Sequence, residues 1–151
     1  MRLKRYLRER HYWGTAGAGA VVYCDATKRV LALKRSQAVD QGGQWTIVVG
    51  GAIDSNEDPK IAAKREVFEE TQYKGPIKKI DIINKFSDID EYTQNEFTYH
   101  TFKFTIPYEF EPRFNWENDD YYWWDGKERI PGKLHFGARD ILKKAKGKIF
   151  K

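Results

Sequence analysis

The sequence of 151 residues lacks features that would place it in several other classes of protein. Cys24 is its only cysteine, so an internal disulfide and a cysteine-based zinc site are both excluded, as expected in a reducing cytosol. No apolar run approaches the roughly 18 residues of a membrane span, and no apolar signal region follows the basic N-terminus. We therefore expect a cytoplasmic, unprocessed protein with no membrane association.

No proline- or glycine-rich linker divides the chain. Its 40% hydrophobic and 15% aromatic content is enough for one well-packed core, so we expect a single domain over residues 1–151. Cys24 lies in an apolar run with no base nearby, which favours a buried strand residue over a nucleophile.

The net charge of +5 is concentrated at the two ends of the chain. Residues 1–10 hold five basic residues and one acidic residue, and residues 143–151 hold five lysines, which leaves the part between them mildly acidic. Basic tails of this kind are often only solubilising, so the high pI alone does not indicate a nucleic-acid-binding protein.

The expected elements include both strands and helices. We expect a strand hairpin over residues 17–36, a short strand at Trp45–Val49, strands from Ile77 and from Phe97, and a last amphipathic helix over residues 134–147 that ends at Gly147. The strand from Phe97 alternates clearly and is expected to be central, whereas residues 88–96 are polar and are expected to form a loop.

The stretch from Gly50 to Tyr73 organises the rest of the chain. Asp58 suits an N-cap and Pro59 the first helical position, so a helix is expected from residue 59 to about Gln72. At about 100° per residue, three glutamates share roughly one third of its circumference. They are Glu66, Glu69 and Glu70.

Two interpretations of this acidic face are open. It is either a solvated surface balanced by nearby lysine and arginine residues, or a binding face for a cation. Like charges at these spacings repel, so a bound hard divalent cation with oxygen ligands would stabilise the arrangement.

The spacing of the polar residues favours the second interpretation, because it resembles the Nudix box, Gly-x5-Glu-x7-Arg-Glu-U-x-Glu-Glu-x-Gly-U, where U is a bulky apolar residue. Seven positions across 23 residues match the pattern: Gly51, Glu57, Arg65, Glu66, Val67, Glu69 and Glu70. Agreement at this many fixed offsets is a specific signal. Two departures are visible. Gln72 replaces the second glycine of the box, and the segment Trp45–Val49 lacks the usual proline and is one residue longer, so a bulge or shifted register is expected there.

The resemblance implies an α/β fold of the Nudix type, an α/β/α sandwich with a mixed central sheet. It also implies hydrolysis of the pyrophosphate bond of a nucleoside diphosphate derivative by water attack on phosphorus, with Mg2+ or Mn2+ as cofactor. The expected metal ligands are Glu66, Glu69 and Glu70, joined by the carbonyl of Gly51. Arg65 is expected to pair with Glu57 and orient it.

The stretch Asn115–Trp124 resembles the late acidic loop and strand of many Nudix hydrolases. On that resemblance Glu117 is a candidate for an extra metal ligand or general base, ahead of Asp119 and Asp120. The aromatic residues of 109–125 either stack on a nucleobase or fill the space between the sheet and the last helix.

Three functions fit these observations. The first is a Nudix pyrophosphohydrolase acting on a small nucleotide such as a nucleoside triphosphate, ADP-ribose or a dinucleoside polyphosphate. The second is a nucleotide-binding sensor without turnover, against which the complete glutamate set argues. The third is action on RNA 5′ ends through the basic tails. The family includes monomers and homodimers, and both are open here.

Overall fold

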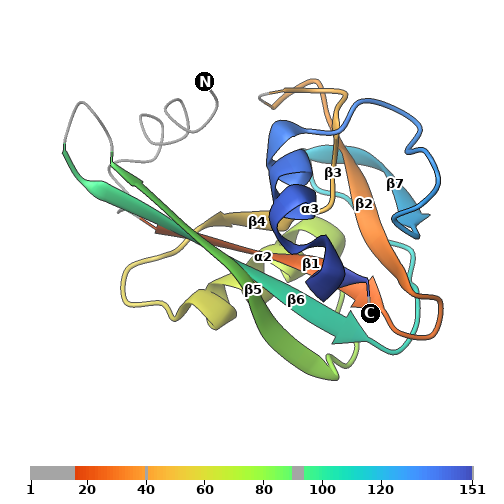
Figure 1. Cartoon of the computed structure of the whole chain (residues 1–151), viewed down its shortest axis with the longest axis horizontal. Helices are drawn as coiled ribbons and strands as arrows, with labels where there is room; N and C mark the ends of the chain where they lie inside the picture. Colours follow the sequence, from red (N-terminus) through yellow and green to blue (C-terminus); the bar gives the residue numbers. More distant parts are fainter. Residues whose placement is uncertain (1–15, 40, 90–93, 151) are drawn as a thin grey trace.

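The computed structural model describes residues 16–39, 41–89 and 94–150. Residues 1–10, the predicted basic segment, and residues 90–93 of the predicted loop lie outside this range. The described chain forms a seven-stranded sheet with two helices (Figure 1). The strands are β1 (Ala16–Cys24), β2 (Arg29–Arg35), β3 (Trp45–Thr46), β4 (Val49–Ala52), β5 (Lys79–Ile89), β6 (Glu96–Ile106) and β7 (Asn118–Trp124), and the helices are α2 (Pro59–Thr71) and α3 (Phe136–Ile149).

Strand β1 connects the two halves of the sheet. It pairs parallel with β6 along its whole length, antiparallel with β4 at Gly17–Ala20, and antiparallel with β2 at its end. Strand β6 lies between β1 and β5, which confirms its predicted central position. The sheet is therefore mixed, and β7 joins it through β2.

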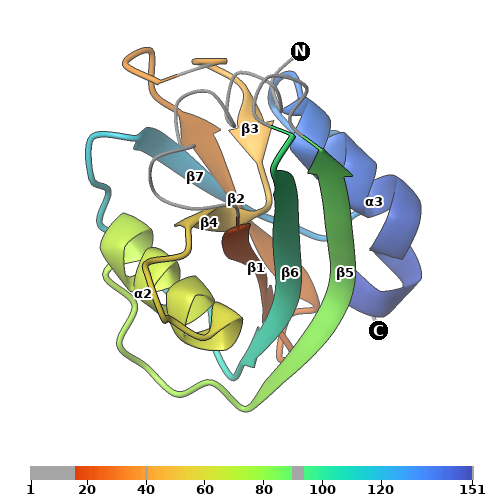
Figure 2. The ribbon, with the colours of Figure 1, turned by 90° about the vertical axis from the view of Figure 1, so that its left-hand side faces the viewer.

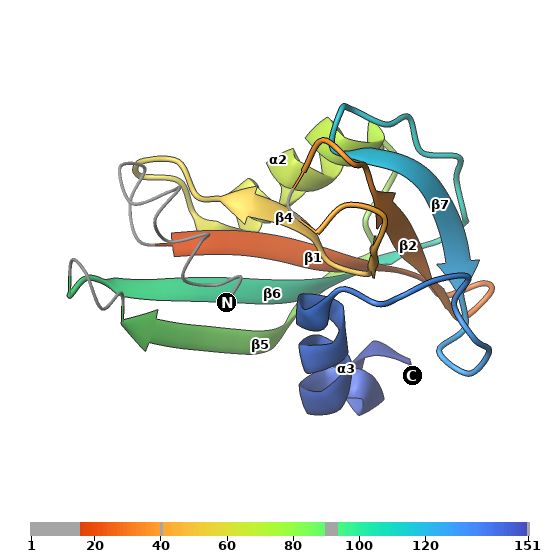
Figure 3. The same ribbon diagram turned by 90° about the horizontal axis from the view of Figure 1, so that it is seen from above.

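The two helices cover opposite faces of the sheet, as Figures 2 and 3 show. Alternate residues of β1 face each side: Ala18, Ala20 and Val22 pack in a cluster with α2, while Val21 and Tyr23 pack in a second cluster with α3. This alternation follows from the two-residue period of a strand. The architecture is the α/β/α sandwich with a mixed central sheet that the resemblance implies.

Helix α2 begins as the sequence predicts and ends at Thr71. The side chain of Asp58 accepts a hydrogen bond from the backbone N–H of Lys60, and Pro59 takes the first helical position. Gln72 adopts the left-handed conformation with φ 63°, and its backbone N–H donates to the carbonyl of Phe68. Gln72 thus provides a left-handed helix cap at a position where glycine is more common.

The predicted strand at Trp45–Val49 is wrong in one respect, because the structure divides it. Strand β3 pairs with β2, whereas β4 pairs with β1. At the bend, the Thr46 hydroxyl accepts a hydrogen bond from the backbone N–H of Val48 at 3.2 Å. This change of partner brings Gly50 and Gly51 beside β1.

Helix α3 and strand β5 begin two residues later than predicted, at Phe136 and Lys79, and both continue past their predicted ends. Helix α3 continues past Gly147 to Ile149, although Ala145 has non-helical angles, because the side chain of Ile149 is fully buried in the cluster beneath the helix. Strand β5 also extends to Ile89, into the predicted loop. Within the described ranges, neither helix has the length and apolar character needed to cross a membrane.

Candidate active site

The acidic face of α2 packs partly against the sheet. Glu66 and Glu70 lie one turn apart and are buried, with 9% and 6% of their surfaces exposed, whereas Glu69 is exposed. A charged carboxylate is costly to bury unless it is paired or bound to a cation. Two of the three predicted ligands therefore occupy positions that a merely solvated face would not produce.

Arg65 connects the box residues through its guanidinium group. Its Nε and Nη2 donate to the two carboxylate oxygens of Glu57, each at 2.9 Å, and Nη2 also donates to the carbonyl of Ala52 at 2.9 Å. Its Nη1 donates to Glu66 at 2.9 Å and to Glu69 at 3.2 Å. The hydrogen bonds from Arg65 lower the pKa of Glu57. The expected pair of Arg65 and Glu57 is thus present as a two-pronged ion pair.

Gly51 leaves space for the carboxylate of Glu66. A Cβ atom at residue 51 would lie 2.7 Å from Glu66 Oε2 and 2.8 Å from Oε1. Strand β4 holds this position by pairing Gly51 with Ala18 of β1. Glycine is needed here because a side-chain atom would occupy the volume of the carboxylate.

Strand β7 brings a second group of polar residues to the acidic face. Asn118 is buried, and its Nδ2 donates to Glu70 Oε1 at 3.0 Å. The backbone carbonyl of the preceding residue, Glu117, accepts a hydrogen bond from the N–H of Ser36. Asp119 and Asp120 are both exposed. Sequence reasoning missed Asn118, because a single asparagine at the start of a strand carries no spacing signal.

The buried glutamates have raised pKa values. Burial raises the pKa of Glu66, although Arg65 opposes the shift, and the charges of Glu69 and Glu117 raise it further. Burial followed by the charges of Glu117 and Glu66 raises the pKa of Glu70 well above its usual value. These effects indicate that the acids of α2 and Glu117 interact within one cluster.

This cluster fits a divalent cation chemically. Glu70 Oε2 is buried and has no hydrogen-bond partner in the described part of the chain. The available donors are carboxylate and carbonyl oxygens, which are the ligands that Mg2+ and Mn2+ prefer. Among the described residues, however, no three His, Cys, Asp or Glu side chains are already grouped closely enough to hold an ion. The guanidinium of Arg65 lies between Glu66 and Glu69 in this arrangement.

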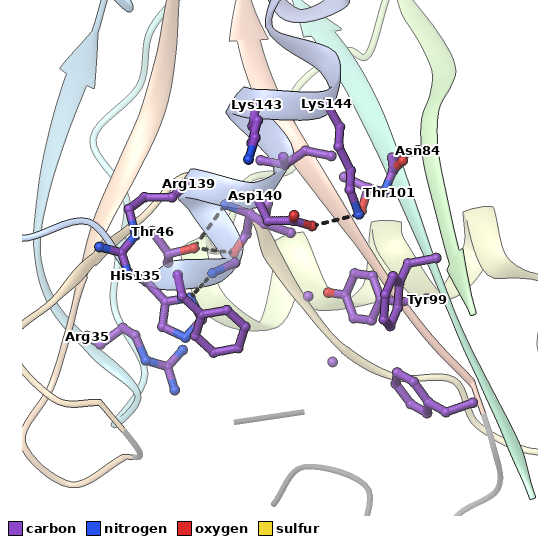
Figure 4. A pocket seen from close by; sticks show the side chains of 18 residues that line it. Arg35, Thr46, Asn84, Tyr99, Thr101, His135, Arg139, Asp140, Lys143 and Lys144 are labelled. Atoms are coloured by element: carbon purple, nitrogen blue, oxygen red, sulfur yellow. Dashed lines mark hydrogen bonds and ion pairs between the residues drawn. The ribbon is translucent and has the colours of Figure 1, made fainter. Parts of the chain in front are cut away.

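A cavity of about 510 Å³ opens on the other face of the sheet, beside α3 (Figure 4). Gly50 and Gly51 reach it from β4, and Tyr99 and Thr101 reach it from β6. The side chain of Tyr99 lies against the glycines of β1 and β4, because Cβ atoms at Gly17, Gly19 and Gly50 would lie within 2.7 Å of it.

The polar part of the cavity carries more positive than negative charge. Arg35, Arg139, Lys143 and Lys144 line it together with one acid, Asp140, which pairs with Lys144 at 3.1 Å. Arg35 also contributes to the acidic cluster, because its charge lowers the pKa of Glu70. The cavity and the acidic face therefore have Arg35, Gly50 and Gly51 near their common boundary.

The aromatic residues of 109–125 are distributed over both faces of the sheet, so most of them do not fill the predicted space between the sheet and the last helix. Trp123 and Trp124 are buried in opposite clusters, and Phe110 and Phe114 pack against the cluster that contains α2. Trp116 is 68% exposed. None of these residues lines the cavity described above.

The comparison with protein families matches the model described as NUDIX domain to residues 14–145. A curated relative from Streptomyces rubellomurinus, a CMP-5'-(N-acetyl-N-hydroxy-3-aminopropyl)phosphonate hydrolase, is 36% identical over 66 residues, which are 44% of this chain and 32% of that protein. The chain spans about a third of the length of the curated relatives it matches.

Solved structures with the same fold include a MutT NUDIX hydrolase from Burkholderia pseudomallei, with a TM-score of 0.67 and 22% identity over 86% of this chain and 96% of that one. They also include the NUDIX domain of Shewanella oneidensis NrtR in complex with ADP ribose, with a TM-score of 0.68 and 18% identity over 89% of this chain and 88% of that one. At these identities the likeness concerns the fold.

Proposed function

The chain belongs to the NUDIX domain family, and we propose that it is a divalent-metal-dependent hydrolase that cleaves the pyrophosphate bond of a nucleoside diphosphate derivative. The observation that carries this proposal is the burial of two carboxylates, that of Glu66 against Gly51 and that of Glu70 with one oxygen lacking a partner in the described chain. A bound Mg2+ or Mn2+ would neutralise charge on the phosphates and promote the attack of water on phosphorus.

The proposed ligands are Glu66, Glu69, Glu70 and the carbonyl of Gly51. Arg65 holds Glu57 and Glu66 in place through the hydrogen bonds described above. For Glu69 to join the ligands, its carboxylate has to exchange Arg65 for the cation. Its exposure makes this exchange feasible, because an exposed side chain changes rotamer at little cost.

Glu117 is the proposed general base. Its charge acts on Glu66 and Glu70, which supports a position within reach of the same cluster. Asn115 constrains it, because Asn115 Oδ1 accepts the backbone N–H of Glu117 at 2.9 Å and Asn115 Nδ2 donates to its Oε1 at 3.3 Å. A carboxylate oxygen of Glu117 would take the proton of the attacking water as the phosphorus–oxygen bond of the leaving phosphate breaks.

The cavity beside α3 is the proposed site for the nucleoside. Its aromatic wall at Tyr99 suits a base or ribose, and the positive charge of Arg35 near the acidic face suits the phosphates. The Streptomyces relative is named for a substrate that joins CMP to another group, which supports a nucleotide linked to a second group as substrate class. A nucleoside triphosphate, ADP-ribose and a dinucleoside polyphosphate all meet this description.

The test is a Mg2+-dependent hydrolysis assay on a panel of nucleotides, with identification of the products. It compares wild type with two variants of proposed ligands and one matched control variant. Glu69→Gln and Glu70→Gln remove proposed ligands without changing side-chain volume, while Asp119→Asn makes the same change in an exposed acid of the neighbouring strand. We expect large losses of kcat for the two glutamine variants and wild-type activity for Asp119→Asn. Equal activity in Glu69→Gln, Glu70→Gln and wild type would refute the catalytic assignment.

Nucleotide binding without turnover is the second candidate function. The position of Arg65 between Glu66 and Glu69 favours it, because a guanidinium there replaces the charge that a cation would bring. Calorimetric binding of the panel nucleotides with no product under Mg2+ or Mn2+ would support this alternative. Action on RNA 5′ ends remains a prediction from the basic tails, and a basic tail acting on RNA should give a steep salt dependence of affinity.

A further inference from the structure

Asn118 has an unusual position for a polar residue, at the start of β7 and 4% exposed. Its Nδ2 donates to Oε1 of Glu70 at 3.0 Å across a separation of 48 residues. Both partners are buried, so solvent does not compete for this hydrogen bond. The contact is therefore a fixed connection between the last strand and the acidic face of α2.

The two oxygens of Glu70 have different surroundings. Oε1 accepts the amide of Asn118, whereas Oε2 is buried without a partner in the described ranges. Asn118 thus fixes Oε1 of Glu70 and leaves Oε2 available to a cation.

The backbone around Asn118 restricts the movement of its amide. Asn118 pairs with Arg35 of β2 at the point where the register of the two strands shifts, between Lys34 and Arg35. The adjacent carbonyl of Glu117 accepts the N–H of Ser36 at 2.8 Å. The amide is therefore held by strand pairing on one side and by Glu70 on the other.

We propose that Asn118 is a positioning residue for metal binding: it orients the carboxylate of Glu70 so that Oε2 is presented to a divalent cation. This inference rests on the proposed metal dependence and adds a residue that lies outside the glycine-to-glutamate motif of α2. Groups that orient a ligand in this way typically change metal affinity by about 10–100-fold when they are removed.

The test measures Mn2+ affinity directly, by electron paramagnetic resonance of the free ion in the absence of nucleotide. Asn118→Leu removes the donor while keeping the number and branching of the side-chain heavy atoms, and Glu70→Gln removes the ligand that it orients. We expect Asn118→Leu to weaken Mn2+ binding by about 10–100-fold. In the Glu70→Gln background, Asn118→Leu should have no further effect, because it acts through Glu70.

Two additional variants separate positioning from folding. Asn118→Gln keeps the amide on a longer side chain and should recover part of the lost affinity. Asn118→Ala replaces the leucine variant if the latter does not fold, because truncation introduces no clash. Thermal unfolding in EDTA checks that each variant is folded before Mn2+ is added.

The outcomes distinguish this inference from the proposed function. Wild-type Mn2+ affinity in Asn118→Leu, or an equal loss with and without Glu70, would overturn the positioning role while leaving the metal site intact. Mn2+ binding that does not depend on Glu70 at all would overturn the proposed metal site itself, and the positioning role with it.

Discussion

Gly51→Ala should destabilise the protein, and the same substitution should stabilise it when Glu66 is replaced by alanine. Residue 51 does not have a positive φ, so an alanine suits the backbone, and fewer unfolded conformations would favour the variant by about 0.4–1 kcal/mol. A contact with Glu66 opposes this gain. The Cβ atom of the alanine would lie 2.7–2.8 Å from the Glu66 carboxylate, which must then move and lose its hydrogen bond from Arg65 Nη1. A lost hydrogen bond between charged groups costs about 1.5–3 kcal/mol.

We therefore expect Gly51→Ala to lower the free energy of unfolding by about 1–2 kcal/mol, which lowers the unfolding temperature by several degrees in a protein of this size. Chemical denaturation of four proteins measures it: wild type, Gly51→Ala, Glu66→Ala and the double variant. In the Glu66→Ala background the clash is absent, so Gly51→Ala should become stabilising by about 0.4–1 kcal/mol. The change of sign is the specific result that the geometry requires.

Gly50→Ala is the matched control for this cycle. Its Cβ would lie 2.5 Å from the carbonyl oxygen of Ala18 and 2.6 Å from the Cα of Gly19, which are backbone atoms that cannot rotate away. We expect a loss larger than that of Gly51→Ala in both backgrounds. If Gly51→Ala lowers the free energy of unfolding equally with and without Glu66, contact with the Glu66 carboxylate is not the reason that residue 51 is glycine.

The remaining predictions concern titration, the ion pair and the cavity. The raised pKa of Glu70 means that its contribution to the stability of the metal-free protein is present below an ordinary glutamate pKa of about 4.3 and lost as pH rises through the raised value. Glu70→Gln should therefore unfold at a progressively higher temperature than wild type between pH 4 and 8, and calorimetry showing the opposite trend would contradict the assigned burial. Arg65→Lys cannot make the two-pronged contact with Glu57, so kcat with the preferred nucleotide should fall by about 10-fold or more while KM changes less. Tyr99→Ala should raise KM for that nucleotide by about 5–150-fold if a base stacks in the cavity, since stacking contributes about 1–3 kcal/mol, whereas Trp116→Ala should leave KM unchanged.

Much of the fold and part of the site could be predicted because they depend on local patterns. The start of α2 follows from Asp58 and Pro59, and the packing of Phe102, Phe104 and Ile106 of β6 in one cluster follows from the two-residue period of a strand. The spacing of Gly51, Glu57 and Arg65 in the sequence indicates that they belong to one site. The contact between Arg65 and Glu57, eight residues apart, is within the reach of such reasoning.

Other features depend on contacts between distant segments. The break between β3 and β4 arises because two different strands, β2 and β1, supply the partners for residues 45–52. Helix α3 passes Gly147 because Ile149 finds a buried position, which its own sequence does not reveal. The contact of Asn118 with Glu70 depends on the register of β7 on β2, and the cavity is lined by residues from β4, β5, β6 and α3 together.

The backbone of Gly50 and Gly51 separates the cavity from the acidic face of α2. A Cβ at residue 50 would point to Tyr99 on the cavity side, and a Cβ at residue 51 would point to Glu66 on the acidic side. Under the proposed function, a nucleoside and a cation would therefore contact the same two residues from opposite faces. Their binding should be thermodynamically linked, and by reciprocity the factor by which Mn2+ changes nucleotide affinity must equal the factor by which the nucleotide changes Mn2+ affinity.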